Sequence, residues 1–143
     1  MRAARWLVLA GGAGAFAAGC GGRETASPDA RRAVQLTAQQ RNAVLVEMRT
    51  LLASVGGVLG AAVRSDSMGI RGAAKASGTA AAADPALEKL LPADWLQLAM
   101  QTHQGFDSLA AAAGAGRDAV VLRLGNITTN CVSCHAMYRL ATR

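Results

Sequence analysis

The sequence predicts an all-α protein, an antiparallel bundle of four helices. Three stretches repeat apolar residues at alternating steps of four and three, which places those residues on one face of a helix. Short segments rich in glycine or proline separate the stretches, and short connections join helices that run antiparallel. No stretch alternates apolar and polar residues with period two for long enough to predict a strand.

Residues 1–19 are typical of an export signal. Arg2 and Arg5 supply a positive beginning, and residues 6–18 form an apolar run that is too short to span a bilayer and ends in small residues. Glycines within that run argue against a buried helix. We therefore expect an exported protein whose remaining chain is long enough for one domain.

Cys20 distinguishes two kinds of export signal. Residues 18–20 resemble the end of a bacterial lipobox, in which the cysteine is lipidated and becomes the new N-terminus, although Ala17 stands where leucine is usual. We expect a lipidated Cys20 that anchors the protein to the membrane in the periplasm, with an ordinary cleaved signal as the alternative. Residues 20–29, small and polar, are then a tether, and residues 30–143 form the folded domain.

The first predicted helix covers residues 30–63. Its apolar face has one charged member, Arg41, which would need a partner because burying an unpaired guanidinium is costly. An acidic group of a bound ligand is one such partner, and a side chain that reaches the solvent at the edge of the bundle is the alternative. The members of this face are Val34, Ala38, Arg41, Leu45, Met48, Leu52, Val55 and Leu59.

The second helix, residues 65–83, has a thin apolar face weakened by glycines, with Ser65 or Asp66 as its cap. A short turn over residues 86–91 leads to the third main helix, residues 92–113. The face of this third helix repeats the four and three spacing with Trp95, Ala99, Thr102, Phe106, Leu109 and Ala113.

The fourth helix begins near Asp118 and ends near the C-terminus. Its face steps by four and three through Val120, Leu124, Ile127, Cys131, Cys134 and Tyr138. Two cysteines therefore lie on the face that we expect to be buried.

Residues 131–135 carry the most specific chemical signal in the chain. Two cysteines separated by two residues and followed by histidine form the attachment pattern of c-type haem. The thiols of Cys131 and Cys134 add across two vinyl groups as thioethers, and His135 presents its imidazole to the iron. On a helix these three side chains span an arc of roughly 100°, which a porphyrin can cover.

Two other readings of this motif stay open. A single metal ion is a harder fit, because zinc usually takes four ligands and His103 is the only other histidine. A redox dithiol is the second alternative. A structural lipoprotein that binds no haem is a further hypothesis, in which the motif is accidental.

The charge pattern excludes some classes of function. The formal charge is +6, but the charged residues are scattered and aromatic residues are few, so we expect no binding to nucleic acid. A solvated surface is the simplest interpretation of these charges, and a basic face toward an acidic redox partner is the other. No pattern of nucleophile, base or paired carboxylates predicts an enzyme.

The chain resembles the class II c-type cytochromes, the cytochrome c′ family, over residues 34–139. The haem motif near the end of the fourth helix, followed by Tyr138 and Arg139, is similar to the signature of that family. Arg41 followed four residues later by Leu45 is similar to its first-helix pattern. The resemblance implies covalent haem on the C-terminal helix of the bundle, a propionate contact for Arg41 and a distal-pocket position for Leu45.

This resemblance also implies a function. Low-spin members use methionine as sixth ligand, often where Leu45 stands here, so we expect His135 to be the sole protein ligand of the iron. Met48 lies one turn away and is the alternative sixth ligand. We expect a periplasmic haem protein that transfers electrons or binds a diatomic gas, NO or CO. Its partner is a periplasmic or membrane redox protein, and first helices pair subunits in many members, so a homodimer is a further expectation.

Overall fold

The computed structural model describes residues 29–82 and 85–143, and these parts of the protein are mostly helical, as expected. The predicted export signal, Cys20 and nearly all of the predicted tether lie outside the described residues. In chain order the elements are β1 (Arg32–Leu36), α1 (Ala38–Val63), α2 (Ser67–Lys75), the 3-10 turn η1 (Thr79–Ala81), α3 (Pro85–Glu88), α4 (Ala93–Ala111), α5 (Arg117–Met137) and β2 (Tyr138–Thr142).

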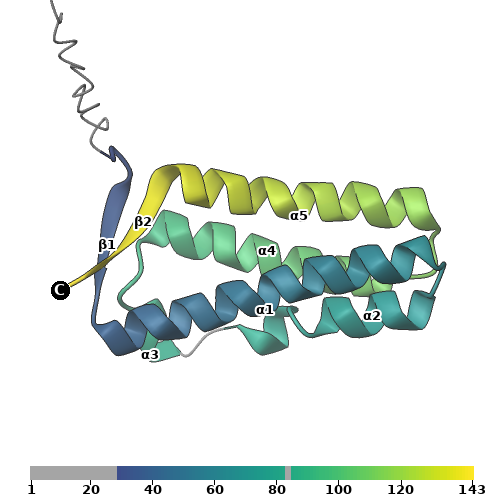
Figure 1. Cartoon of the computed structure of the whole chain (residues 1–143), viewed down its shortest axis with the longest axis horizontal. Helices are drawn as coiled ribbons and strands as arrows, with labels where there is room; N and C mark the ends of the chain where they lie inside the picture. Colours follow the sequence, from purple (N-terminus) through teal and green to yellow (C-terminus); the bar gives the residue numbers. More distant parts are fainter. Residues whose placement is uncertain (1–28, 83–84) are drawn as a thin grey trace, which may run out of the picture.

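The longer helices lie side by side along the length of the molecule (Figure 1). Helix α1 packs against α2 and α5, and α4 packs against the same two helices. The main core fills the space among them with buried side chains that include Val58, Ile70, Phe106, Leu109, Leu124 and Ile127. The apolar faces predicted for α4 and α5 are confirmed, since their members are buried or half-buried in the structure.

The face predicted for the first helix is partly wrong. Leu52 is 70% exposed and Leu59 is 44% exposed, although both were expected in the core. Arg41 is also exposed, so it does not face a core. The side of α1 that packs against the other helices instead carries Val44 and Val58, which are buried.

The expectation that the chain has no strand is wrong. Strands β1 and β2 pair in parallel at one end of the molecule, with Arg32 opposite Tyr138 and Leu36 opposite Thr142 (Figure 1). Val34 and Leu36 alternate with exposed residues along β1 and are buried beside Tyr138. The partners in this parallel pair lie about a hundred residues apart in the chain, and the local sequence pattern does not show such a pairing.

A capping box explains why the first helix begins at Ala38 and not at residue 30. The side chain of Thr37 accepts a hydrogen bond from the backbone N–H of Gln40, and the side chain of Gln40 accepts one from the backbone N–H of Thr37. At the next helix the carboxylate of Asp66 accepts from the N–H of Gly69, 2.8 Å away, and this confirms one of the two expected caps.

Small residues allow the helices to approach closely at two positions. A Cβ on Gly57 of α1 would lie 3.0 Å from the Cβ of Ala73 near the end of α2. A Cβ on Gly105 of α4 would lie 2.7 Å from Cγ1 of Ile127 of α5. Ile127 is buried and β-branched, so it cannot move aside easily.

This close contact predicts opposite effects for two glycine substitutions. Gly105→Ala should lower the free energy of unfolding by about 1–3 kcal/mol, because the added methyl group overpacks the contact between α4 and α5. The matched control is Gly125→Ala in α5, where nothing lies within 4 Å of the added carbon. That change should raise stability by up to about 1 kcal/mol through helix propensity alone. Urea unfolding measures both, and equal effects would contradict the packing argument.

Candidate functional site

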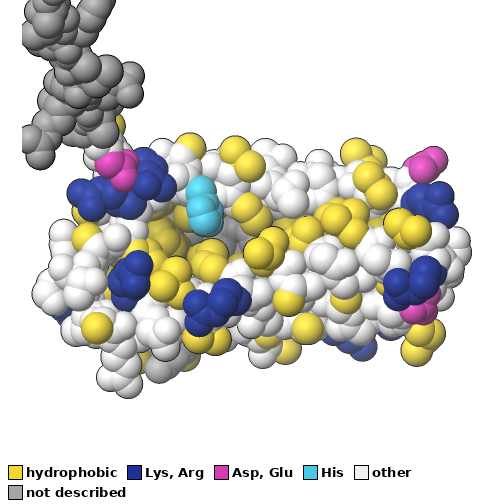
Figure 2. All heavy atoms as spheres, in the orientation of Figure 1, with side chains coloured by type: hydrophobic (Ala, Val, Ile, Leu, Met, Phe, Trp, Pro, Cys, Tyr) yellow, Lys and Arg dark blue, Asp and Glu magenta, His cyan; other side chains and the backbone are white. Residues whose placement is uncertain are grey.

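A cavity of about 410 Å³ opens between α1, α4 and α5. Its volume falls in the range of roughly 300–1,000 Å³ that is usual for small-molecule and cofactor sites. Most of its lining is apolar, and Trp95 and Phe106 of α4 supply its aromatic side chains. Figure 2 shows a hollow on one face of the molecule, in which hydrophobic side chains are visible between positively charged ones.

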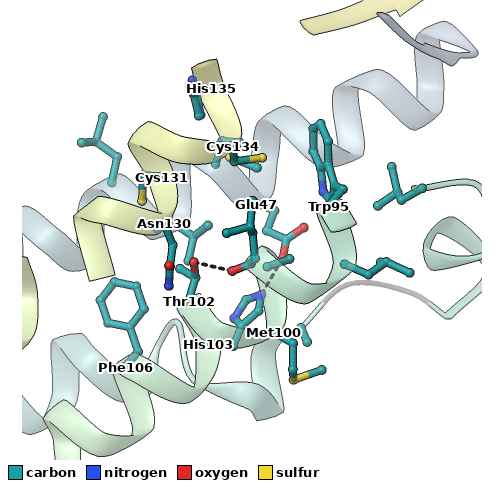
Figure 3. Close-up of a pocket in the computed structure, with 18 of the residues that line it drawn as sticks. Glu47, Trp95, Met100, Thr102, His103, Phe106, Asn130, Cys131, Cys134 and His135 are labelled. Carbon is teal, nitrogen blue, oxygen red and sulfur yellow. Dashed lines mark hydrogen bonds and ion pairs between the residues drawn. The ribbon is translucent and has the colours of Figure 1, made fainter. Parts of the chain in front are cut away.

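The three residues of the haem motif border this cavity from α5. Cys131 and Cys134 are half-buried, and His135 is exposed at the edge. Figure 3 shows the three side chains along one helix, with Phe106 and Trp95 of α4 on either side. The expected placement of the motif on the last helix is thereby confirmed. Both described cysteines are free thiols.

Helix α1 supplies a second wall with Leu45, Met48, Leu52 and Val55. Four consecutive members of the apolar face predicted for the first helix therefore border the cavity. This explains why Leu52, expected in the core, is exposed. Arg41 does not border the cavity, and its contact with a haem propionate stays a prediction.

Burial raises the pKa of both thiols in the motif. For Cys131 the loss of solvation is the cause. For Cys134 burial comes first, and the neighbouring Cys131 thiol and the carboxylate of Asp94 add to it, so that its pKa rises to about 11. The thiolate is the nucleophile in thiol–disulfide exchange, and dithiols that exchange rapidly have depressed pKa values. The environment of these cysteines is therefore unlike that of a redox dithiol.

The end of α5 is fastened to the segment before β1. The guanidinium of Arg31 donates to the backbone carbonyl of His135 at 3.3 Å, and it also forms an ion pair with Asp29 at 2.8 Å. This hydrogen-bonded pair lowers the pKa of Asp29 to about 2. Arg139 of β2 approaches the same carboxylate at 3.9 Å. These contacts fix the backbone at His135 although its side chain is exposed.

A partly buried ion pair crosses from α1 to α4 at the cavity. Nε2 of His103 lies 3.0 Å from Oε1 of Glu47, and its Nδ1 lies 2.9 Å from the carbonyl oxygen of Ser77. Figure 3 shows the Glu47 and His103 side chains pointing toward each other. A carbonyl oxygen can only accept, so Nδ1 donates to Ser77. With Glu47 ionised, Nε2 must donate as well, and the ring is then an imidazolium.

The same pair also borders a second cavity, of about 360 Å³. That cavity lies along the other side of α1 and is lined by Val46, Thr50 and Leu87, among others. Glu47 and His103 are therefore part of the partition between the two cavities. Their hydrogen bonds hold this partition in place.

Sequence reasoning missed the residues of this partition. His103 was considered only as a second histidine, and Glu47 was not singled out. A signal was present, because each is an ionisable residue directly beside a member of an apolar face, Thr102 in one helix and Met48 in the other. Pairing them needs the relative register of two helices, which the sequence pattern does not supply. Asn130 and Arg49, which also border the cavity, were missed as well.

Among residues 29–82 and 85–143, no three side chains of His, Cys, Asp or Glu are grouped so that they could hold a metal ion. The two thiols and the imidazole of α5 border the cavity together with Glu47, Glu88 and His103 from other elements. Comparison with protein-family models, with curated proteins and with solved structures found no match.

The Glu47–His103 pair predicts how stability depends on pH. Its carboxylate raises the pKa of His103 above the usual value near 6.5, despite burial. The imidazolium therefore contributes stability that is fully present below about pH 6.5 and is lost as the pH rises through the raised pKa. His103→Gln should cost about 1–3 kcal/mol at pH 6 and remove this pH-dependent part.

Denaturant unfolding of protein made without haem, between pH 5 and pH 9, measures this dependence. His135→Gln is the matched control, because its ring is exposed and its variant should keep the wild-type dependence. Glu47→Gln should resemble His103→Gln. A His103→Gln variant that keeps the full pH dependence would contradict the assignment.

Proposed function

We propose that this chain is a c-type haem protein in which Cys131 and Cys134 hold the haem covalently and His135 binds the iron. The observation that carries the proposal is that all three residues lie on one face of α5 and border a single apolar cavity. The mostly helical fold and the packing of α1, α2, α4 and α5 support a four-helix bundle of the kind found in class II c-type cytochromes.

The residues present fit such a group. Each thiol would add across a vinyl double bond, so that sulfur bonds to one vinyl carbon and a proton is added to the other. The product is an uncharged thioether, which suits half-buried positions where thiolates are disfavoured. The apolar side chains of α1 and α4 would cover the porphyrin and exclude water from it.

Haem, when bound, supplies one-electron redox chemistry and a site for small ligands, and the protein decides between these uses through the axial ligands. His135 would coordinate the iron from α5. Leu45 and Met48 border the cavity from α1, three residues apart on the same helix face. Leucine has no lone pair to offer, so an iron faced by Leu45 would stay open to a diatomic gas. We propose this five-coordinate form.

A redox dithiol is the second candidate built on the same residues, and the raised pKa values of both thiols weigh against it. Purification after expression with a haem-maturation system separates the candidates in one step. A haem protein shows a Soret band, whereas a dithiol, a protein that binds a bare metal ion and a structural lipoprotein do not. An absent Soret band would refute the proposal.

We further propose that the protein works in the bacterial periplasm and is anchored by lipid on Cys20. Its partner would be a periplasmic or membrane redox protein, or a diatomic gas at the iron. Homodimer formation is part of the same proposal, and α1 exposes Val46, Leu59 and Val63 on its surface. By length and composition alone, α1 could also cross a membrane. This is weak evidence for a membrane span, because the core-facing side of α1 packs on other helices.

Covalent attachment predicts the behaviour of the cysteine variants. Replacing Cys131 or Cys134 singly by serine should remove one thioether and leave the haem attached through the other. Replacing both should make the haem extractable with acid-acetone. Mass spectrometry of the extracted protein measures what remains bound, and a double variant that keeps its haem covalently would contradict the attachment sites.

Coordination by His135 alone predicts a high-spin haem. The reduced protein should bind carbon monoxide, and the ferric protein should lack the long-wavelength charge-transfer band of a methionine-ligated haem. Leu45→Met should create a six-coordinate form with a raised potential, because a thioether ligand favours the reduced iron. Optical and electron paramagnetic resonance spectra measure both changes.

Met48→Leu is the matched control for this series. It should leave the spectra of the native protein unchanged if Met48 only fills space in the cavity. A native protein that shows the methionine band and loses it in Met48→Leu would make Met48 the sixth ligand. The function would then be plain electron transfer.

A further inference from the structure

Arg49 is a cation at the cavity that is unpaired within the part of the chain that the structure describes. Among the described residues that line the cavity, it is the one arginine or lysine. It is exposed on α1, and it forms no ion pair with any described residue. The mouth of the apolar cavity therefore has a cation that is free to bind an anion.

The other charged groups at the cavity cannot take this role. His103 is already paired with Glu47 at 3.0 Å and is buried. Glu88 also borders the cavity and would repel a carboxylate. Arg41 lies eight residues before Arg49, which is about 12 Å along the helix, and does not border the cavity.

We infer that Arg49, and not Arg41, receives the carboxylate of the group that the cavity holds. This inference rests on the proposed function, in which that carboxylate is a haem propionate. A guanidinium binds a carboxylate through two parallel hydrogen bonds, so it fixes an orientation as well as supplying charge. With the thioethers on α5 and the cation on α1, the haem would lie across the cavity with a propionate at Arg49.

The first test compares the reduction potentials of three variants of the haem-loaded, full-length protein. A cation beside a propionate favours the reduced state, which carries one more electron. Arg49→Leu should therefore lower the midpoint potential, Arg49→Lys should lower it less, and Arg41→Leu should leave it unchanged. The effect of Arg49→Leu should shrink as salt is added, because the site is exposed. A potential that responds to Arg41→Leu and not to Arg49→Leu would overturn the inference.

The second test addresses the carboxylate directly and does not depend on the potential. In the full-length Cys131→Ser/Cys134→Ser protein, haem and its dimethyl ester can be titrated as non-covalent ligands. Arg49→Leu should weaken the binding of haem by about two- to fivefold, as expected for a partly exposed ion pair, and should leave the binding of the ester unchanged. Equal losses for both ligands would overturn the inference.

The two proposals fail in different ways. A wild-type protein that acquires no haem during maturation would refute the proposed function, and the role of Arg49 with it. A haem-loaded protein whose potential and ligand preference ignore Arg49 would refute only the role of Arg49.

Discussion

The ion pair between Glu47 and His103 holds together the part of the structure on which the candidate site depends. It joins α1 to α4 along the border of the larger cavity, and His103 extends the connection to the backbone of Ser77. Buried charges are stable only when they are paired and hydrogen-bonded. Each charge is compensated only while the other lies beside it. The pair therefore fixes the spacing between α1 and α4, which share few apolar contacts.

Other polar contacts reinforce this spacing from the neighbouring segments. The hydroxyl groups of Ser54 and Ser77 lie 2.7 Å apart in the interior, and the hydroxyl of Thr79 donates to Asp107 at 2.6 Å. These contacts fasten the segment between α2 and α3 onto α1 and α4. Together with the two apolar clusters, these polar links give the cavity defined walls.

The sequence predicts α4, α5 and the placement of Cys131, Cys134 and His135 on the last helix, because each depends on local spacing. Residues spaced three and four apart lie on the same face of any α-helix, so this pattern does not depend on the rest of the fold. The three motif residues likewise lie within about one turn of α5. The strands β1 and β2 could not be predicted in this way, because each is stabilised by a partner at the other end of the chain. The T-x-x-Q pattern at Thr37 did mark the true start of α1.

The first helix shows that apolar periodicity alone does not tell what covers an apolar face, because Leu52 and Leu59 on that face are exposed. Leu45, Met48 and Leu52 repeat as core residues do, yet in the structure they border a cavity. Spacing alone does not distinguish a wall that faces other side chains from one that faces a ligand. The charged residues among them are more informative. Glu47 finds a buried partner on α4, and Arg49 has none among the described residues, so the unmatched charge indicates where a ligand's own charge would lie.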